Sequence, residues 1–376
     1  MTITIASDFA QLDQVIATVV APGADAVDRE GRFPRTSIDA LAKAGYLGLI
    51  SAKEVGGSGC GIAEAALVVE RLGQACGSTA MIMCMHYSAT AVLEAHGTKE
   101  VREAIAGGRH LSTLAFSEVG SRSMFWAPLS TAVVAGARVR LDASKSWVTA
   151  AGEADSYVWS SRPLAAAGAS TLWLVPKGAE GLSAAIPFNG LGLRGNDSSP
   201  VTASSAMVPL SAMLGKDGDG FNVMMGVVLP WFQVLNSAMS IGLMNAAVTA
   251  TADHMSRARF EHLGQSVAEQ PVPRSLIAQM RVRTDLARAL WQDTIAAITA
   301  KRADTMLRVL EVKLAASEAA LEVTDLGMRI CGGAAFRRES PIERHFRDAR
   351  AAAVMAPTSE ALADFIGKAV CGLPLF

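Results

Sequence analysis

The hydrophobic pattern along the chain changes twice. Up to about residue 110, apolar positions recur with the three-to-four-residue spacing of amphipathic helices, and glycines separate the segments. This first region therefore predicts helices over residues 8–21, 36–44, 62–72, 78–95 and 100–106.

The pattern becomes strand-like between residues 111 and 214. Short runs of alternating apolar and polar residues are separated by turn residues such as Gly168 and Asn189-Gly190. Strands joined by such short turns are typical of an antiparallel sheet. The strongest strand predictions are residues 130–136, 137–143, 156–161, 170–176 and 201–209.

Helical periodicity returns at Phe221 and continues to the end of the chain. The longest segments are residues 273–302, 305–331 and 357–371, each apolar on one face and joined by short loops. This combination is typical of an antiparallel helix bundle. The fold class is thus α+β and mostly α. We expect a helical N-terminal domain (1–112), a β-rich middle domain (113–215) and a C-terminal helical domain (216–376).

One uncharged segment is long enough to cross a membrane. No Asp, Glu, Lys or Arg occurs between Gly220 and Ala252. However, Asn222, Gln233 and Asn236 interrupt the segment, and no basic cluster flanks it. We expect a buried helix, broken near Pro230, and no membrane span. The first residues lack a basic stretch followed by an apolar run, so we expect a cytoplasmic protein without a secretory leader.

Composition narrows the function classes. Of the 376 residues, 51% are apolar and only 18% are charged, which excludes a disordered chain and suggests extensive subunit or cofactor interfaces. A net charge of −1 argues against a nucleic-acid binder. Five cysteines without a CxxC pair, and six histidines without ligand spacing, argue against disulfides and a metal site. No GxGxxG, GxxxxGK[ST], HExxH or GxSxG motif is present.

Several motifs, in order along nearly the whole chain, resemble the acyl-CoA dehydrogenase superfamily of flavoproteins. They are FPRTSIDALAKAGYLGLISAKEVGGSGCG (33–61), LAFSEVGS (114–121), KSWVTAAGEAD (145–155), LGLRGNDSSPVTASSAMVP (191–209), LGKDGDGF (214–221), RICGGAAF (329–336) and RHFRDAR (344–350). The resemblance implies a β-barrel-like middle domain, a C-terminal four-helix bundle, and a homotetramer or homodimer. It also implies FAD between the middle domain and the bundle.

The resemblance implies which residues contact the cofactor and the substrate. Ser117, Trp147, Thr149 and Thr358 would lie along the flavin. Gly332 and Gly333 would let the backbone approach the pyrophosphate arm of a neighbouring subunit's FAD. Arg257 and Arg259 would replace a family arginine at that pyrophosphate, because a guanidinium suits phosphate. Substrate contacts are expected from Ser121, Ser123, Phe232, Gln233 and Ala356.

The sequence departs from the family at the catalytic base. Dehydrogenation of an acyl thioester needs a carboxylate that removes the α-proton. The family's usual position for it is Ala356 here, and a second position used by some members is Phe232. Glu118 and Glu360 are weak substitutes, since a structural role and a solvated helix position explain them better. The catalytic residue is therefore unknown from the sequence.

Three functions stay open. The first is an FAD-dependent oxidoreductase that dehydrogenates a CH–CH bond of an acyl thioester, carried by CoA or an acyl carrier protein, with a displaced or absent base. Its electrons would pass to an electron-transferring flavoprotein or to oxygen. The second is a flavin-dependent monooxygenase, or another member that needs no α-proton base. The third is a redox-inert subunit that has lost catalysis.

Overall fold

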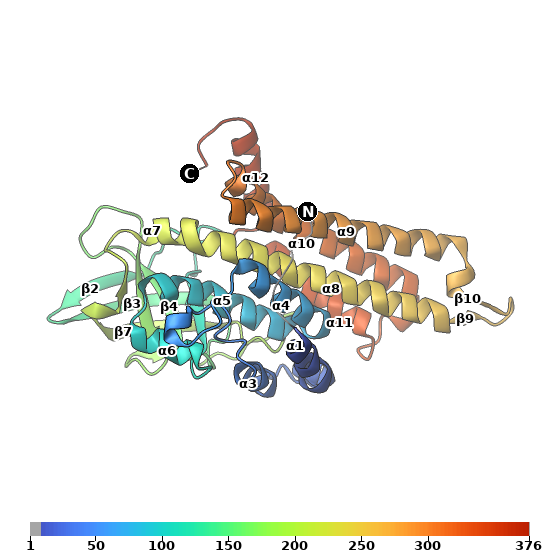
Figure 1. The fold of residues 1–376 in the computed structure, drawn as a ribbon, viewed down its shortest axis with the longest axis horizontal. Coiled ribbons are helices and arrows are strands. Elements are labelled where there is room, and N and C mark those ends of the chain that lie inside the picture. Colours follow the sequence, from blue (N-terminus) through green and yellow to red (C-terminus); the bar gives the residue numbers. More distant parts are fainter. Residues whose placement is uncertain (1–8, 376) are drawn as a thin grey trace.

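The computed structural model describes residues 9–375, and helices dominate it (Figure 1). The first part of the chain is helical, as predicted. Its elements are α1 (Ala10–Val15), the π-helical turn η1 (Ile16–Val20), α2 (Ala21–Glu30), α3 (Arg35–Lys43), the 3-10 turn η2 (Lys53–Val55), α4 (Ile62–Ala75), α5 (Gly77–His96) and α6 (Lys99–Ala106).

The middle part forms two four-stranded sheets. One has the order β1 (Ser112–Ala115), β4 (Ser156–Ser161), β5 (Thr171–Pro176) and β8 (Met213–Leu214). The other has the order β2 (Thr131–Ala135), β3 (Arg138–Val148), β7 (Ser199–Pro209) and β6 (Leu182–Ser183). A short 3-10 turn, η3 (Leu210–Ala212), precedes β8.

The two sheets confirm a β-rich middle domain whose strands pair mostly in antiparallel fashion, but they correct the expectation of a barrel. Among the described strands the sheets do not close into a barrel, and β1 pairs with β4 in parallel. Parallel pairing arises because a long crossover connects these strands instead of a hairpin. The faces of the sheets enclose a core around Trp159 and Trp173, which are fully buried.

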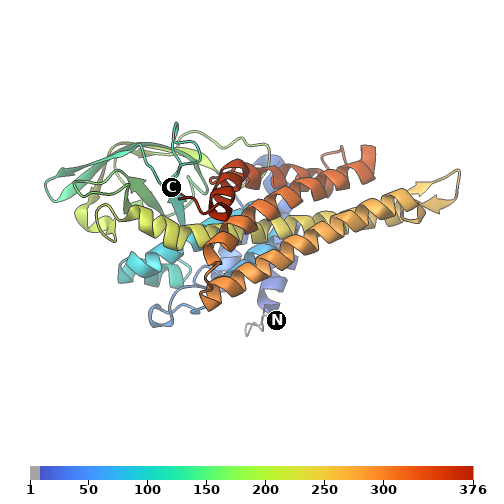
Figure 2. The ribbon, with the colours of Figure 1, turned by 90° about the horizontal axis from the view of Figure 1, so that it is seen from above.

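The C-terminal part contains the longest helices. Its elements are α7 (Gly220–Val223), the π-helical turn η4 (Met224–Val228), α8 (Leu229–Arg257), β9 (Arg259–Phe260), β10 (Gln265–Ser266), the 3-10 turn η5 (Val267–Glu269), α9 (Pro271–Ala300), α10 (Thr305–Cys331), the 3-10 turn η6 (Gly332–Ala334), α11 (Pro341–Val354) and α12 (Ser359–Val370). Helix α10 packs against α8, α9, α11 and α12. The sheets lie at one end of the molecule and the β9–β10 hairpin at the other (Figures 1 and 2).

The expected break near Pro230 is wrong, because the helix continues from Gly220 to Arg257. The π-helical turn η4 ends two residues before Pro230, in the same way that η1 ends two residues before Pro22 of α2. The wider turn accommodates the proline, which has no N–H to donate to an α-helical partner. By length and composition this helix is the one in residues 9–375 that could cross a membrane, but 83% of its most apolar window is buried inside the protein.

Helix α8 is central because the N-terminal helices pack on it closely. A Cβ atom on Gly242 would lie 2.3 Å from the backbone oxygen of Glu70. A Cβ on Gly73 of α4 would lie 2.9 Å from the backbone oxygen of Met239. Neither distance is compatible with a side chain, so these two glycines allow α4 to rest against the backbone of α8.

A buried ion pair joins β3 to the loop that follows β1. The Lys145 ammonium lies 2.5 Å from Oε1 of Glu118 and donates to the backbone oxygen of Ser160. The other carboxylate oxygen accepts from the backbone N–H groups of Leu129 and Ser130. Burial lowers the pKa of Lys145 to about 8, although the Glu118 charge opposes the shift. Burial alone would raise the pKa of Glu118, but the Lys145 charge and the hydrogen bonds hold it below its ordinary value.

We therefore expect Glu118→Ala to destabilise the protein by about 3–5 kcal/mol, because it leaves the Lys145 ammonium buried without a counter-charge. The double variant Glu118→Gln with Lys145→Met removes both charges and should recover much of the loss. Urea unfolding followed by circular dichroism measures both effects. A loss below about 1 kcal/mol in Glu118→Ala would contradict the structural importance of the pair.

Candidate functional site

A large cavity lies where the sheets meet the C-terminal helices. Its volume is about 860 Å³, within the size range of small-molecule and cofactor sites. The walls come from α5, β1 and its following loop, the end of β3, residues 188–198, the start of α8, the end of α11 and residues 355–358. Most lining residues are apolar, including Met81, Met85, Leu114, Phe116, Leu229 and Phe232.

All four residues expected beside the flavin line this cavity: Ser117, Trp147, Thr149 and Thr358. Ser117 follows β1, and its carbonyl accepts from the backbone N–H of Ser146 on β3. Trp147 lies at an irregularity in the pairing of β3 with β7 and has a positive φ of 57°. Its side chain remains 70% exposed, with the ring edge-on to Phe188 at 6.4 Å. Thr149 is buried, and its hydroxyl lies 3.2 Å from the hydroxyl of Ser198.

The segment from residue 188 to 198 forms a wall that sequence reasoning did not assign. Its lining residues are Phe188, Gly190, Leu191, Gly192, Leu193, Asn196 and Ser198. The Asn196 carbonyl accepts from the backbone N–H of Ala150, which fixes the segment to the end of β3. The motif LGLRGND, recognised at positions 191–197, was the signal that could have located this wall.

Helix α11 holds the same segment from the other side. The Asp348 carboxylate accepts from the backbone N–H of Leu193 at 2.6 Å. Burial raises the pKa of Asp348 to about 6, and the Leu193 hydrogen bond opposes that shift. The neighbouring Arg347 lines the cavity and pairs with Asp28 and Glu343. The wall is therefore braced by both the bundle and the N-terminal helices.

The loop after β1 brings one of its two candidate serines to the cavity. Ser123 lines it, and its hydroxyl donates to the Thr358 hydroxyl over 3.4 Å. Thr358 also lines the cavity and caps α12 by accepting from the N–H of Ala361. Ser121 is turned away, because its hydroxyl bonds to the backbone of Glu118. The structure thus brings Ser123 and Thr358 together and leaves Ser121 outside.

Both base positions of the family lie on the cavity wall without a carboxylate. Phe232 and Ala356 line the cavity, as expected. Among the described lining residues, Glu118 is the one carboxylate, and its two oxygens already accept from Lys145, Leu129 and Ser130. Glu360 is exposed on α12 and does not line the cavity. In the part of the chain that the structure describes, no group of three or more His, Cys, Asp or Glu side chains could hold a metal ion.

The segment around Ala356 is fixed by a buried lysine. The Lys313 ammonium donates to the backbone oxygens of Met355 and Pro357, at 2.9 and 2.7 Å. Burial lowers the pKa of Lys313 to about 7, while the Glu360 charge acts in the opposite direction. Lys313 thus holds the backbone on both sides of Ala356.

Four residues expected at the FAD pyrophosphate lie away from the cavity. Arg257 ends α8 and Arg259 belongs to β9, whereas Gly332 and Gly333 follow α10. Helix α10 lies beside α8 near these ends, because a Cβ on Gly327 would be 3.1 Å from the Thr251 hydroxyl. Neither Gly332 nor Gly333 has an atom within 4 Å of the position of an added Cβ. The open glycine backbone after α10 and the arginines at the end of α8 suit a phosphate-bearing ligand. A phosphate bound there would not lie in the large cavity of the same chain.

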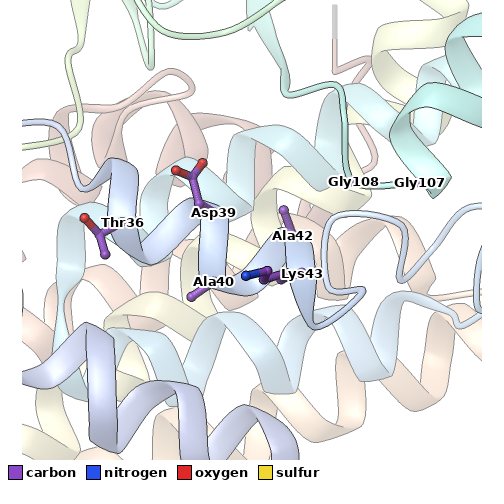
Figure 3. Close-up of a pocket in the computed structure, with 7 residues that line it drawn as sticks. All are labelled: Thr36, Asp39, Ala40, Ala42, Lys43, Gly107 and Gly108. Atoms are coloured by element: carbon purple, nitrogen blue, oxygen red, sulfur yellow. The ribbon is translucent and has the colours of Figure 1, made fainter.

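A second hollow of about 520 Å³ lies beside α3 (Figure 3). It is lined by Thr36, Asp39, Ala40, Ala42, Lys43, Gly107 and Gly108. The Asp39 and Lys43 side chains point in different directions and both are exposed. Two separated surface charges do not make a reaction centre, so the larger cavity is the candidate active site.

The large cavity fits the cofactor that the sequence resemblance implies. Trp147 presents a mostly open indole on its rim, and hydroxyl and backbone groups of Ser117 and Thr149 lie nearby on the same wall. An aromatic face and hydrogen-bonding groups suit a planar heteroaromatic ring.

The comparisons agree with the geometry. Residues 10–107 match the model of the acyl-CoA dehydrogenase N-terminal domain, and residues 218–371 match that of the acyl-CoA dehydrogenase C-terminal domain. The chain is 28% identical to acryloyl-CoA reductase (NADH) of Anaerotignum propionicum, over 95% of this chain and 90% of that protein. It is 27% identical to the short-chain specific acyl-CoA dehydrogenase of Clostridium acetobutylicum, over 91% of each.

A solved structure supports the fold. Butyryl-CoA dehydrogenase of Megasphaera elsdenii superposes with a TM-score of 0.90 at 22% identity, covering 99% of this chain and 100% of that one. Members of this family are FAD-dependent enzymes that act on CH–CH bonds, and the cavity lies between the same parts of the chain that the resemblance assigned to FAD. The chain belongs to the acyl-CoA dehydrogenase family and is an FAD-dependent oxidoreductase that acts on acyl-CoA.

Proposed function

We propose that this protein dehydrogenates an acyl thioester between its α- and β-carbons without a carboxylate at either usual base position. One observation supports the proposal above the others: Phe232 and Ala356 both line the cavity, and neither can accept a proton. The reaction breaks one C–H bond at each carbon and forms a C=C bond. Bound FAD would take the hydride from the β-carbon together with its two electrons.

The chain's own residues bind and orient the reactants in this proposal. Trp147 and Thr149 lie along the flavin, and Ser117 contributes a hydrogen bond near it. Ser123 and Thr358 meet across the cavity and contact the thioester or its carrier arm. The apolar wall of Met81, Met85 and Phe116 packs against the acyl chain.

The α-proton passes to solvent in this proposal. Glu118 is a poor acceptor because its carboxylate is already held by a buried ammonium and two backbone N–H groups. Glu360 is exposed on α12, away from the cavity. Loss of a positioned base typically costs about 10²–10⁴-fold in rate, so slow turnover on ordinary thioesters is expected.

A second copy of the chain completes the FAD site in this proposal. Arg257 and Arg259 lie at and just after the end of α8, Gly332 and Gly333 follow α10, and none of the four lines the cavity of the same chain. A homodimer or homotetramer would bring them to the pyrophosphate of a neighbour's FAD. We further propose that the enzyme is cytoplasmic and that an acyl carrier protein can replace CoA as the thioester carrier. An electron-transferring flavoprotein would be its electron acceptor.

The proposed reaction predicts that a suitable acyl thioester bleaches the bound flavin without oxygen. An anaerobic visible spectrum of the purified holoenzyme, with a panel of short acyl thioesters, measures this directly. Flavin that ignores every thioester but consumes oxygen once reduced would instead indicate a monooxygenase. A protein that cannot be loaded with FAD would indicate a redox-inert subunit.

The empty base position predicts a gain of function. Ala356→Glu should raise the rate of flavin reduction by roughly 100-fold, because it supplies a carboxylate on the cavity wall. The rate should rise with pH as that carboxylate ionises. Ala356→Gln is the matched control and should give no increase, while Glu360→Gln should keep the wild-type rate. Equal rates for the Glu and Gln variants in stopped-flow reduction would contradict the proposed position.

The shared FAD site predicts complementation between two variants. Trp147→Ala alters the cavity side and Gly333→Val alters the remote side, so each homo-oligomer should bind FAD about tenfold more weakly. Co-expressed subunits carrying one change each should contain some fully intact sites. Flavin content per subunit, measured by absorbance, should therefore exceed that of either variant alone. No recovery in the mixed oligomers would mean that the site belongs to one chain.

A further inference from the structure

Two amide side chains on α8 are buried without the hydrogen bonds they need. Gln233 and Asn236 each have a relative exposure of 0%. Among the described residues, neither polar atom of the Gln233 amide has a partner, and the side-chain oxygen of Asn236 has none. An amide buried without a partner destabilises a protein, so such groups usually have a hydrogen-bond partner.

These amides lie directly behind the wall of the large cavity. Gln233 follows Phe232, which lines the cavity, and lies one helical turn after Leu229, which also does. Asn236 donates to the Met355 sulfur over 3.3 Å, and Met355 is itself a lining residue. The thioether of Met355 therefore lies between the Asn236 amide and the cavity. Methionine has an unbranched, flexible side chain, so it can move aside more easily than the other wall residues.

The wall residues beside Met355 are small and held in place. Ala356 leaves its part of the wall without a long side chain. Lys313 fixes the backbone on both sides of Ala356 through the oxygens of Met355 and Pro357. Access to the Asn236 amide therefore needs movement of the Met355 side chain, whose backbone is held by Lys313.

We infer that Gln233 and Asn236 form a polar recess behind Met355 that hydrogen-bonds a polar substituent on the acyl chain. The recess offers N–H donors and C=O acceptors, so a hydroxyl group, which can both donate and accept, matches it. The substrate class is then an acyl thioester that carries a hydroxyl, or a similar neutral hydrogen-bonding group, on the carbons that pass Ala356. This inference rests on the proposed acyl-thioester function and specifies its substrate.

Binding to the holoenzyme tests the inference without turnover. Three pairs of CoA thioesters differ only by a hydroxyl in place of a methyl: 2-hydroxypropanoyl and 2-methylpropanoyl, 3-hydroxybutanoyl and 3-methylbutanoyl, and 4-hydroxybutanoyl and pentanoyl. Titration calorimetry with the flavin chemically reduced prevents oxidation of the ligand. In one pair, the wild type should bind the hydroxyl member about tenfold more tightly or better.

Variants then identify the residues responsible. Gln233→Met and Asn236→Leu keep the approximate side-chain volume but remove the amide, so either should abolish the hydroxyl preference. Thr251→Val is the matched control, since Thr251 is buried on the same helix about 22 Å further along and should keep the preference. Thermal unfolding of each variant shows whether it is folded.

The outcomes separate this inference from the proposed reaction. If no thioester bleaches the oxidised flavin but the hydroxyl preference appears and depends on Gln233 or Asn236, the reaction is wrong and the recess is supported. Equal or weaker binding of the hydroxyl member in all three pairs would overturn the recess. A preference that survives both Gln233→Met and Asn236→Leu would overturn it as well. Binding of no thioester at all would count against both.

Discussion

The architecture of the active site depends on the buried contact between Lys145 and Glu118. This pair ties β3, which carries Trp147, to the loop that carries Ser117 and Ser123. Both charges are removed from water, so the arrangement persists only because each has partners: Ser160 for the ammonium, and two backbone N–H groups for the carboxylate. The same contacts engage the Glu118 carboxylate on the cavity wall, which leaves it poorly suited to proton transfer.

The remaining walls are held by contacts between distant segments. Asp348 on α11 anchors the 188–198 segment through the N–H of Leu193, and Arg347 links the same helix to Asp28 of α2. Lys313 on α10 holds the backbone around Ala356. Buried charges that bond to backbone atoms position those backbones with little freedom, because breaking such a bond leaves an uncompensated charge. The cavity is thus braced on several sides by groups that do not themselves react.

The polar groups around the cavity differ from those that the resemblance implies at the base positions. Carboxylates are missing where the resemblance places a base, whereas the Gln233 amide and the Asn236 side-chain oxygen are buried without a hydrogen-bond partner among the described residues. A carboxylate favours proton removal, and an amide favours recognition by hydrogen bonding. In our proposals, removal of the α-proton is slow because no carboxylate is positioned for it. The buried amides, in contrast, can distinguish one acyl chain from another.

The sequence by itself determined the family, the order of helical and strand-rich parts, and the residue types at the base positions, because these depend on local periodicity and on motifs. It predicted residues 305–331 as a helix with the bounds that the structure shows. It was wrong about a break at Pro230 and about a barrel, because π-helical turns and sheet closure depend on packing against the rest of the chain. Only the tertiary structure decided that Ser123 meets Thr358, that Glu118 is bound by Lys145, and that the Asn236 amide contacts Met355. These contacts join residues up to 235 positions apart, and no pattern along the chain specifies the distance between such side chains.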